Sequence, residues 1–584
     1  MTDPEVEEQP APTAGEPNTV GAGTFALPAG RIAPWEWLVV GGTCLVCLVY
    51  WLLHYHQFYL PSPDTYSFVR AARSLSGGEL PESFKRMPLL PLLMGLLGRL
   101  FTADDPEVHA ALVLNILFSA GSLVFLYLVA RTMIGGAAIL PLILAAGARE
   151  CHQMAGQPLV EPIMAFSILL SLWLFTRKSR WQYLALFFAA LTRYECSALI
   201  AIFFVLNWIY EHKPWRHLAL SALASSGFLL WMALSALHGS SGAGNPYIEQ
   251  MQTQGWRLSP AFAWTFVDES FSGWGAPVWG LLAAGGAWLS WRKCRRESTA
   301  ILLFALLYVI AHVAFGVDRE RYVYPVRWIP PLYLGLCAGA LLGAAGSKWG
   351  QTWTPLRGRL LAGLCALLAL GSGAYGVSKL VGVTGVAPSW AYLALAALLV
   401  IAALAYSGVL LGKPLRAWLA LGLALAAIAA PQVCRGVAAH ARESLPQKYE
   451  SYGSFLTGKW LRENLGAEER ALAPNHLITG RSAGLPRDKV AGFLEVKAED
   501  LDALRAEMAV KKIAYLVYQH FDLPPKGDPR YPLFVRRNRP ELLKRFREGK
   551  PVPGFEHVET LPVPPEARSA DVQIYRLKPP PEAR

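Results

Sequence analysis

The chain has 584 residues, of which 53% are hydrophobic and only 16% charged, and its mean hydropathy is +0.31. Soluble domains carry roughly a quarter charged residues, so this composition excludes an ordinary soluble protein and indicates a membrane protein. The net charge of +12 does not indicate a nucleic-acid partner, because the Lys and Arg residues fall in short clusters between apolar runs rather than along one soluble face.

The stretch over 1–34 is rich in Pro, Glu, Ala and Gly and has no basic segment ahead of an apolar run. It predicts a disordered cytoplasmic leader rather than a cleaved signal peptide. Eight cysteines are scattered along the chain, mostly in or beside apolar runs, and match neither a disulfide framework nor a zinc site. No metal and no cofactor are expected.

The apolar runs that follow approach the ~20 residues needed to cross ~30 Å of hydrocarbon. The longer runs lie at 36–53, 109–131, 218–237, 300–317, 328–346, 390–411 and 416–434. Shorter runs lie at 88–101, 134–148, 162–176, 182–191, 197–210, 275–291 and 359–377. Together they give about fourteen candidate membrane-spanning segments.

Basic clusters between these runs predict which loops lie inside the cell. They occupy 177–180, 213–216, 292–296, 348–359 and 413–416. With a cytoplasmic start and these loops inside, the C-terminal tail lies outside only if the number of crossings is odd. One candidate segment therefore does not cross.

We expect this segment to be 88–101, because it is short and is followed by a cluster of acidic residues. The alternative is that 182–210 forms one broken helix, which would put Arg177 and Lys213 on opposite sides of the membrane against the positive-inside tendency. The resulting fold class is a polytopic α-helical membrane protein with about thirteen transmembrane helices over 35–434 and a first external loop over 54–88.

Charged residues become frequent from residue 435 onward. Amphipathic stretches at 456–464 and 498–510 alternate with β-like runs at 513–518 and 572–577. This pattern predicts a small soluble α/β domain over 435–584. We expect the domain to be periplasmic on a multi-pass protein of the bacterial inner membrane.

Two charged groups stand out in the first external loop. Asp64 follows a proline at the start of a predicted amphipathic helix, where it is either an N-cap or a general base at the mouth of a membrane cavity. Lys85 and Arg86 precede an apolar run that contains Pro88 and Pro91. They are either snorkelling anchors or a clamp for a phosphate group.

Further ionisable residues lie in apolar surroundings, where they are costly and indicate function. These are Glu161, Arg193, Glu195 and the cluster Asp318, Arg319, Glu320 and Arg321 ahead of Tyr322. Pairing of Arg193 with Glu195, or of Arg319 with Asp318, would be as consistent with a structural ion pair as with catalysis. His312 precedes the last cluster by about one and a half helical turns and is placed to face it, although a lone histidine is more often a packed one.

The order of these motifs resembles the GT-C superfamily, and within it the protein mannosyltransferase and aminoarabinose transferase branch. The resemblance covers the chain from about Trp35 to the tail. It implies a glycosyltransferase that moves a hexose or pentose with inversion from a polyprenyl-phosphate carrier to a lipid, glycan or protein acceptor. The reaction would take place at the outer face of the inner membrane.

The resemblance also implies roles for individual residues. Asp64 falls on the first-loop carboxylate of the family, which acts as general base. The residues implied to bind substrate are Lys85, Arg86, Glu161, Arg193, Glu195, Arg319, Arg321 and Tyr322. Among them, Arg86, Arg193 and Arg321 fall on the family's basic residues beside the lipid phosphate, and Asp64, Arg86 and Arg321 are predicted to converge at the interface. This chain has Thr65 where many relatives carry a second acid, and Lys85 and Arg86 where the transferases acting on lipid A carry a Glu. The resemblance therefore implies neither a metal site nor that particular substrate.

Two other classes compete with an enzyme. A secondary transporter would show corresponding halves, and the sequence has none. A non-catalytic scaffold for envelope assembly would keep the fold without the chemistry, and Asp64 pointing into lipid or bulk water would favour it.

Overall fold

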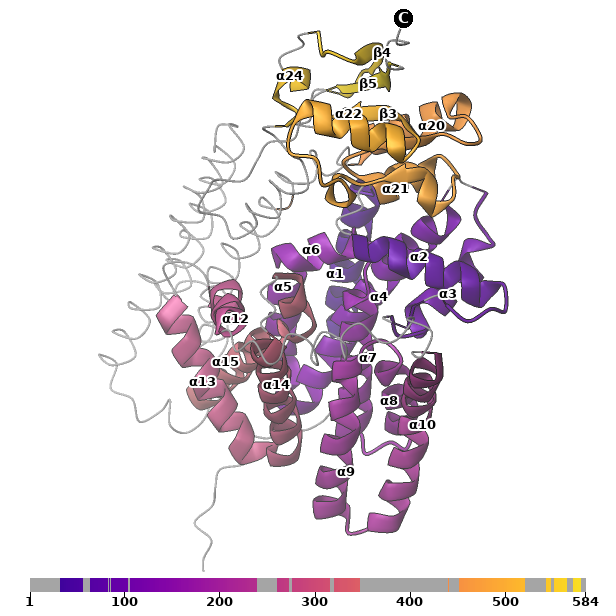
Figure 1. Ribbon diagram of the computed structural model, residues 1–584. Coiled ribbons are helices and arrows are strands. Elements are labelled where there is room, and N and C mark those ends of the chain that lie inside the picture. The colour runs from indigo at the N-terminus through magenta and orange to yellow at the C-terminus, as the bar shows by residue number, and fades with distance from the viewer. Residues whose placement is uncertain are drawn as a thin grey trace, which may run out of the picture.

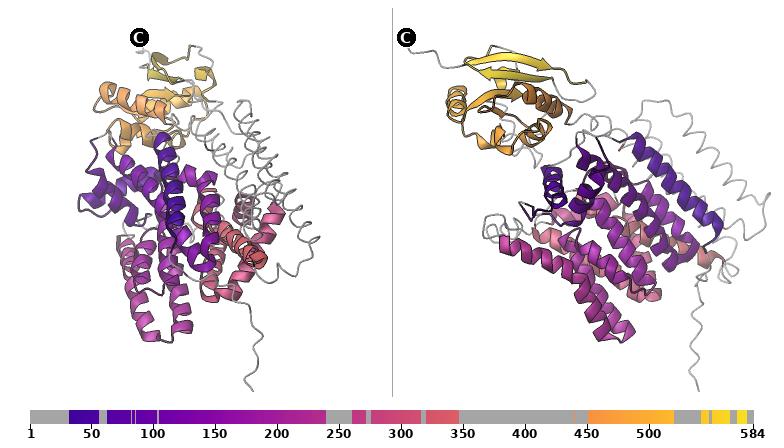
Figure 2. Two further views of the ribbon diagram at one scale, coloured as in Figure 1. Left: turned by 180° about the vertical axis from the view of Figure 1, so that it is seen from behind. Right: turned by 90° about the vertical axis from the view of Figure 1, so that its right-hand side faces the viewer.

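The computed structural model describes residues 32–55, 63–81, 83–84, 86–102, 105–238, 260–271, 276–315, 320–346, 440, 451–519, 542–547, 551–564 and 571–578. Within these ranges a bundle of helices carries a small α/β unit at one end (Figure 1). Both views of Figure 2 show the α/β unit stacked on that end.

The helices of the bundle follow the apolar runs of the sequence. They are α1 Pro34–Leu53, α2 Pro63–Ser76, α3 Leu89–Gly98, α4 Pro106–Ile134, α5 Ile139–Ala146, α6 Arg149–Ala155, α7 Glu161–Thr176, α8 Gln182–Ala190, α9 Ser197–Glu211, α10 Pro214–His238, α12 Ala261–Phe271, α13 Ala276–Lys293, α14 Arg295–Phe315 and α15 Ile329–Gly346. Three short 3-10 turns matter for the site and its surroundings: η1 Gly135–Ala138, η2 Tyr194–Cys196 and η4 Glu320–Val326.

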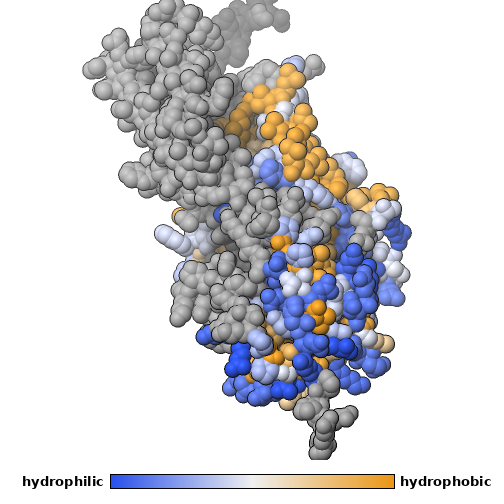
Figure 3. Space-filling view, turned by 90° about the horizontal axis from the view of Figure 1, so that it is seen from above, coloured by the Kyte–Doolittle hydropathy of each residue, from blue (hydrophilic) through white to orange (hydrophobic). Residues whose placement is uncertain are grey.

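Five helical stretches in the described part of the chain are long and apolar enough to cross a membrane. They are Glu36–Leu53, Pro106–Ile134, Tyr194–Glu211, Pro214–His238 and Arg295–Ala314. Seen from above, hydrophilic side chains cover the α/β unit, and hydrophobic ones gather beyond it (Figure 3). The protein is therefore a multi-pass membrane protein with a polar unit at one end of its bundle.

The runs at 182–191 and 197–210 form two antiparallel helices. Asn207, near the end of α9, donates a hydrogen bond of 2.9 Å to the hydroxyl of Tyr183 at the start of α8. His217, near the start of α10, lies 2.8 Å from the same hydroxyl. The basic clusters at 177–180 and 213–216 therefore lie at one end of the bundle, and the alternative of a single broken helix is wrong.

Several candidate segments are shorter than a membrane crossing. Helix α3 has 10 residues, α5 has 8 and α8 has 9, which at 1.5 Å per residue is roughly 12 to 15 Å. That the segment at 88–101 does not cross stays a prediction, because α3 is no shorter than α5 and α8. Helices α5 and α8 pack against the bundle through Leu142, Leu186 and Ala189, whereas Leu184 and Phe188 of α8 are exposed at its surface.

Several parts of the predicted topology fall outside the described residues. These are the leader up to residue 31, the runs at 359–377, 390–411 and 416–434, and the boundary at 434/435. The total of about thirteen crossings accordingly remains a prediction. The spaced pair Cys44 and Cys47 lies in α1, and both thiols are free and buried in the apolar core.

The α/β unit is built on a mixed sheet of five strands in the order β2-β1-β3-β5-β4. The strands are β1 Arg470–Leu472, β2 Val490–Ala491, β3 Ile513–Tyr518, β4 Phe555–Leu561 and β5 Val572–Leu577. β1 pairs in parallel with β2 and β3, whereas β5 is antiparallel to both β3 and β4. The strands predicted at 513–518 and 572–577 are confirmed, and they lie side by side.

Helices cover both faces of this sheet, which explains the apolar run of its central strand. Ile513 and Leu516 of β3 pack with Leu504 of α22 (Leu501–Val510) on one face. Tyr515 and Val517 pack with Trp460 of α20 (Tyr452–Asn464) on the other. The remaining helices are α21 His476–Ser482 and α24 Lys544–Arg547, with 3-10 turns η5 Arg487–Lys489 and η6 Phe493–Glu495.

The α/β unit is joined to the bundle by a group of ion pairs. Arg481 of α21 contacts Asp105 at 2.8 Å and Glu107 at 3.2 Å. Glu107, in the first turn of α4, also pairs with Arg73 of α2 at 2.8 Å. The side chain of Ile478 packs beside them against the apolar cluster shared by α2, α3 and α4. This contact fixes the α/β unit at the end of the bundle that carries α2.

Candidate active site

Helix α2 presents the first-loop carboxylate. Pro63 opens the helix and Asp64 lies in its first turn, where an acidic residue is stabilised by the helix dipole. Phe68 and Ala72 follow on the buried face and pack against Leu90 of α3. The packing of this buried face on α3 places Asp64 in the first turn of α2 rather than at its N-cap.

Two arginines hold the carboxylate of Asp64 from different parts of the chain. Arg86 bonds through Nη2 to Oδ1, and Arg321, 257 residues beyond Asp64, bonds through Nη2 to Oδ2 at 2.5 Å. The side chains of Asp64, Arg86 and Arg321 are 21%, 10% and 12% exposed. Arg86 also donates from Nε to the hydroxyl of Ser67 at 2.6 Å and lies over the ring of Phe68. Arg86 is therefore held by Ser67 and Phe68 as well as by Asp64.

The pairing continues from Arg321 into a row of alternating charge. Arg321 Nε lies 3.9 Å from Glu161 Oε1, and the same oxygen lies 3.3 Å from Arg193 Nη1. Arg193 then pairs with Glu195 at 2.9 Å. Glu161, in the first turn of α7, is almost completely buried, and Arg193 stands just before η2 at the turn between α8 and α9. The row contains three guanidinium groups and three carboxylates, so their charges cancel.

Aromatic rings pack along this row. The hydroxyl of Tyr322 accepts a hydrogen bond of 2.9 Å from Arg321, and the Tyr322 ring centroid lies 4.8 Å from Arg193 and 4.9 Å from Arg321. His312 lies with Nε2 3.7 Å from Glu195 and is stacked on Phe262 at 4.5 Å. His312 therefore faces the charged row from α14.

Neighbouring acids keep Arg321 protonated. Burial by itself lowers the pKa of the Arg321 guanidinium, but Glu161, Tyr322 and Asp64 raise this pKa above its ordinary value. The cation is therefore a permanent charge in the site rather than a proton donor.

The site residues expected from the sequence divide into two groups. The structure brings Asp64, Arg86, Glu161, Arg193, Glu195, Arg321 and Tyr322 together, and His312 joins them. Lys85 and Arg319 lie outside the described residues. In the ranges that the structure covers, no three His, Cys, Asp or Glu side chains are arranged to hold a metal ion.

Sequence reasoning missed the supports of the arginines. Ser67 and Phe68 hold Arg86, and the one available signal was their position one turn after Asp64 on a helix.

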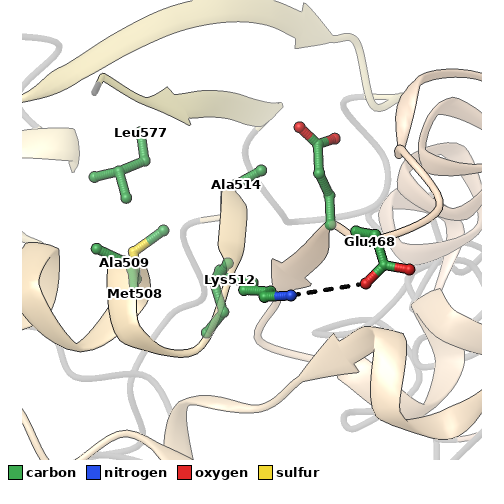
Figure 4. Close-up of a pocket in the computed structure, with 8 residues that line it drawn as sticks. Glu468, Met508, Ala509, Lys512, Ala514 and Leu577 are labelled. Atoms are coloured by element: carbon green, nitrogen blue, oxygen red, sulfur yellow. Dashed lines mark ion pairs between the residues drawn. The ribbon is translucent and has the colours of Figure 1, made fainter.

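A separate hollow of about 360 Å³ lies in the α/β unit (Figure 4). Its lining includes Met508, Ala514 and Leu577, with an ion pair of 3.7 Å between Lys512 and Glu468 at its rim. The hollow shares no residue with the charged row, and its single exposed ion pair provides no arrangement for catalysis.

Comparisons with known proteins place the fold. No protein-family model matches the chain, and no curated protein matches it in sequence. The solved structure of ArnT from Cupriavidus metallidurans bound to undecaprenyl phosphate is similar, with a TM-score of 0.54, 15% identity, and coverage of 93% of this chain and 98% of that chain. The apo state of the same ArnT gives a TM-score of 0.53 at 15% identity, covering 94% of this chain and 99% of that one.

A second similar structure is the oligosaccharyltransferase AglB from Archaeoglobus fulgidus in complex with an inhibitory peptide and a dolichol-phosphate. Its TM-score is 0.50 at 12% identity, with coverage of 83% of this chain and 69% of that chain. At these identities the likeness establishes the fold and not the activity. This chain has the fold of the GT-C membrane glycosyltransferases that its motifs resemble.

Proposed function

We propose that the protein is an inverting glycosyltransferase that transfers a sugar from a polyprenyl-phosphate carrier to a lipid, glycan or protein acceptor. One observation carries this proposal: Asp64 is held between Arg86 and Arg321 at the end of the bundle. A carboxylate beside fixed cations is the minimum needed to remove a proton from a hydroxyl and to stabilise a departing phosphate.

The reaction needs few groups because a glycosyl phosphate already contains a good leaving group. Asp64 accepts the proton of the acceptor while the acceptor oxygen attacks the anomeric carbon from the side opposite the phosphate. The bond from the anomeric carbon to the phosphate oxygen breaks, and its electron pair stays on that oxygen. Arg86 and Arg321 then stabilise the phosphate, since the planar guanidinium fork fits two phosphate oxygens. Direct displacement inverts the anomeric centre without a covalent intermediate.

Arg193, Glu161 and Glu195 extend the site away from Asp64. Their ion pairs fix the orientation of Arg193 and Arg321, and their carboxylate oxygens suit hydroxyl groups of a sugar. The ring of Tyr322 lies against both arginines and helps to hold their guanidinium groups in place.

The ends of α8 and α9 support an outer-face location. Their basic loops at 177–180 and 213–216 lie at the end of the helices where Tyr183 meets Asn207. Arg193 and Glu195 lie in the turn at the other end, where Tyr194 donates to the carbonyl oxygen of Phe84 in the first loop. If the basic loops face the cytoplasm, the site and the α/β unit face the periplasm of the inner membrane.

The experiment is a transfer assay in membranes with radiolabelled polyprenyl-phosphate sugars, comparing the wild type with Asp64→Asn. Glu36→Gln provides a matched control, because Glu36 also pairs with an arginine, Arg131 at 2.7 Å, but near the opposite end of the 29-residue helix α4. We expect transfer by the wild type and by Glu36→Gln, and loss of transfer in Asp64→Asn. Equal transfer by the Asp64→Asn variant would remove Asp64 as the base.

An absence of transfer from every carrier-linked sugar would refute the enzyme and favour a transporter or a scaffold. Against a scaffold stands the position of Asp64 itself, which is directed at Arg86 and Arg321 and not at lipid or bulk water.

A further inference from the structure

The two arginines assigned to the carrier phosphate are already in use. Arg86 and Arg321 each hold one oxygen of Asp64. A guanidinium group has five N–H donors, so a phosphate need not break these bonds, but the carboxylate already compensates the positive charge of both arginines and weakens their attraction for the phosphate. Carboxylate and phosphate are competitors for the same cations.

We propose that Asp64 has a second task besides that of base, which rests on the proposed function: it competes with the carrier phosphate for Arg86 and Arg321 and thereby expels the spent carrier.

The movement of charge during transfer explains why this competition has a direction. In the donor, the phosphate is a diester with one negative charge, and Asp64 carries another. When the acceptor oxygen bonds to the anomeric carbon, its proton passes to Asp64 and the electron pair of the broken bond passes to the phosphate. Asp64 becomes neutral, and the phosphate becomes a monoester with a charge of about −1.5 to −2 at neutral pH. The arginines therefore favour the phosphate during and just after transfer.

The return step uses the same groups. Once the proton of Asp64 leaves to water, its carboxylate is again an anion placed between Arg86 and Arg321. The carboxylate then compensates the charge of the guanidinium groups again, and the phosphate is held less strongly. The carrier product leaves as the site returns to the pairing seen in the structure.

The anchors of the arginines fit a short movement of this kind. Arg86 is held from Nε by Ser67 and from below by Phe68, and Arg321 is held by Tyr322 and by the Glu161 carboxylate. Each guanidinium group thus has contacts that do not involve Asp64, so it can stay in place while its contact with the carboxylate weakens. The helices need not move.

The test is the binding of polyprenyl phosphate without a sugar to the full-length protein in lipid nanodiscs. Asp64→Asn removes the competing charge and keeps the side-chain shape. We expect this variant to bind polyprenyl phosphate on the order of tenfold tighter than the wild type, which corresponds to ~1.4 kcal/mol. An affinity equal to or weaker than that of the wild type overturns the proposal.

Two controls separate competition from a general gain of positive charge. Glu195→Gln removes the same charge from the same row, but Glu195 contacts Arg193 and His312 rather than Arg86 or Arg321. Competition predicts a much smaller gain for Glu195→Gln, whereas an equal gain in both variants refutes it. Uncharged polyprenol, used as a second probe, should bind the wild type and Asp64→Asn equally, and a tenfold gain for polyprenol would also overturn the proposal.

The outcome is independent of the transfer assay. Sugar transfer by the wild type without tighter phosphate binding in Asp64→Asn refutes the second task and leaves the glycosyltransferase intact. Tighter binding without any sugar transfer refutes the glycosyltransferase and leaves the competition between carboxylate and phosphate.

Discussion

Arg481 links the α/β unit to the helix that carries Asp64, and its substitution tests whether that unit positions the site. Arg481 contacts Asp105 and Glu107, and Glu107 contacts Arg73 near the end of α2. Arg73 and Asp64 lie about nine residues, or ~13 Å, apart on one helix. A tilt of α2 would therefore move Asp64 relative to Arg321, which is held by the bundle.

The size of the effect follows from the burial of the partners. The Arg481 side chain is 10% exposed and both of its acids are largely buried. Breaking a fully buried ion pair costs about 3–5 kcal/mol and losing an exposed one about 0–1 kcal/mol. In Arg481→Gln, Glu107 keeps its contact with Arg73, so we expect a loss of roughly 1–2 kcal/mol in the docking of the α/β unit. Carried fully into the activation barrier, this loss lowers the transfer rate by about five- to thirtyfold.

Hydrogen exchange of the α2 amides, measured on the full-length protein in nanodiscs together with kcat and KM, provides the assay. Exchange over Pro63–Ser76 should accelerate in Arg481→Gln. Arg576→Gln is the matched control, because the Arg576 pair with Glu469 is more exposed and lies within the α/β unit. Unchanged α2 exchange and unchanged kcat in Arg481→Gln would refute the positional role of the α/β unit.

Three further predictions concern single groups. Arg321→Gln should lower kcat by about 10²- to 10³-fold, as expected for one preorganised electrostatic contact; Arg321→Lys should restore part of it, and equal kcat in both variants would exclude a role for the charge. His312→Phe should keep the aromatic stack on Phe262 and lose the contact with Glu195, so the melting temperature should hold while kcat falls by less than about tenfold; a collapse in melting temperature would show a structural role instead. Burial by itself raises the pKa of Glu507 in the α/β unit, but hydrogen bonds from Lys511 and from the Ala498 and Lys497 backbone lower this pKa below its usual range. The stability that Glu507 contributes is thus present above its unfolded-state pKa and is lost as the pH falls through its lower folded-state pKa, so the difference in chemical denaturation between wild type and Glu507→Gln should shrink on acidification, and a constant difference would contradict this pairing.

Local sequence patterns predicted the helices and strands whose apolar residues repeat regularly along the chain. The amphipathic pattern after Asp64 produced α2, and the apolar runs at 513–518 and 572–577 produced β3 and β5. The positive-inside tendency separated α8 from α9 correctly, because the charges flanking both segments had to lie on one side.

Other elements lacked a local signal. β1 and β2 have 3 and 2 residues, which is too short for an alternating pattern, and β4 is an exposed edge strand without an apolar face. The contact of Arg321 with Asp64 joins residues 257 positions apart, and nothing in either segment specifies the other. The family resemblance predicted that Asp64, Arg86 and Arg321 converge, and the structure brings these three side chains together. The contacts that continue through Glu161, Arg193 and Glu195 were set by tertiary packing.

The cancelling charges of the row from Arg86 to Glu195 restrict how this site can be altered. Any single loss or gain leaves one full charge unbalanced among largely buried partners, so isolated substitutions should lower stability as well as activity. Variants that keep the fold should instead replace a neighbouring acid and base of the row together. Libraries designed to change the specificity of this site should therefore randomise adjacent acidic and basic positions together. Members in which the net charge of the row differs from zero should be discarded.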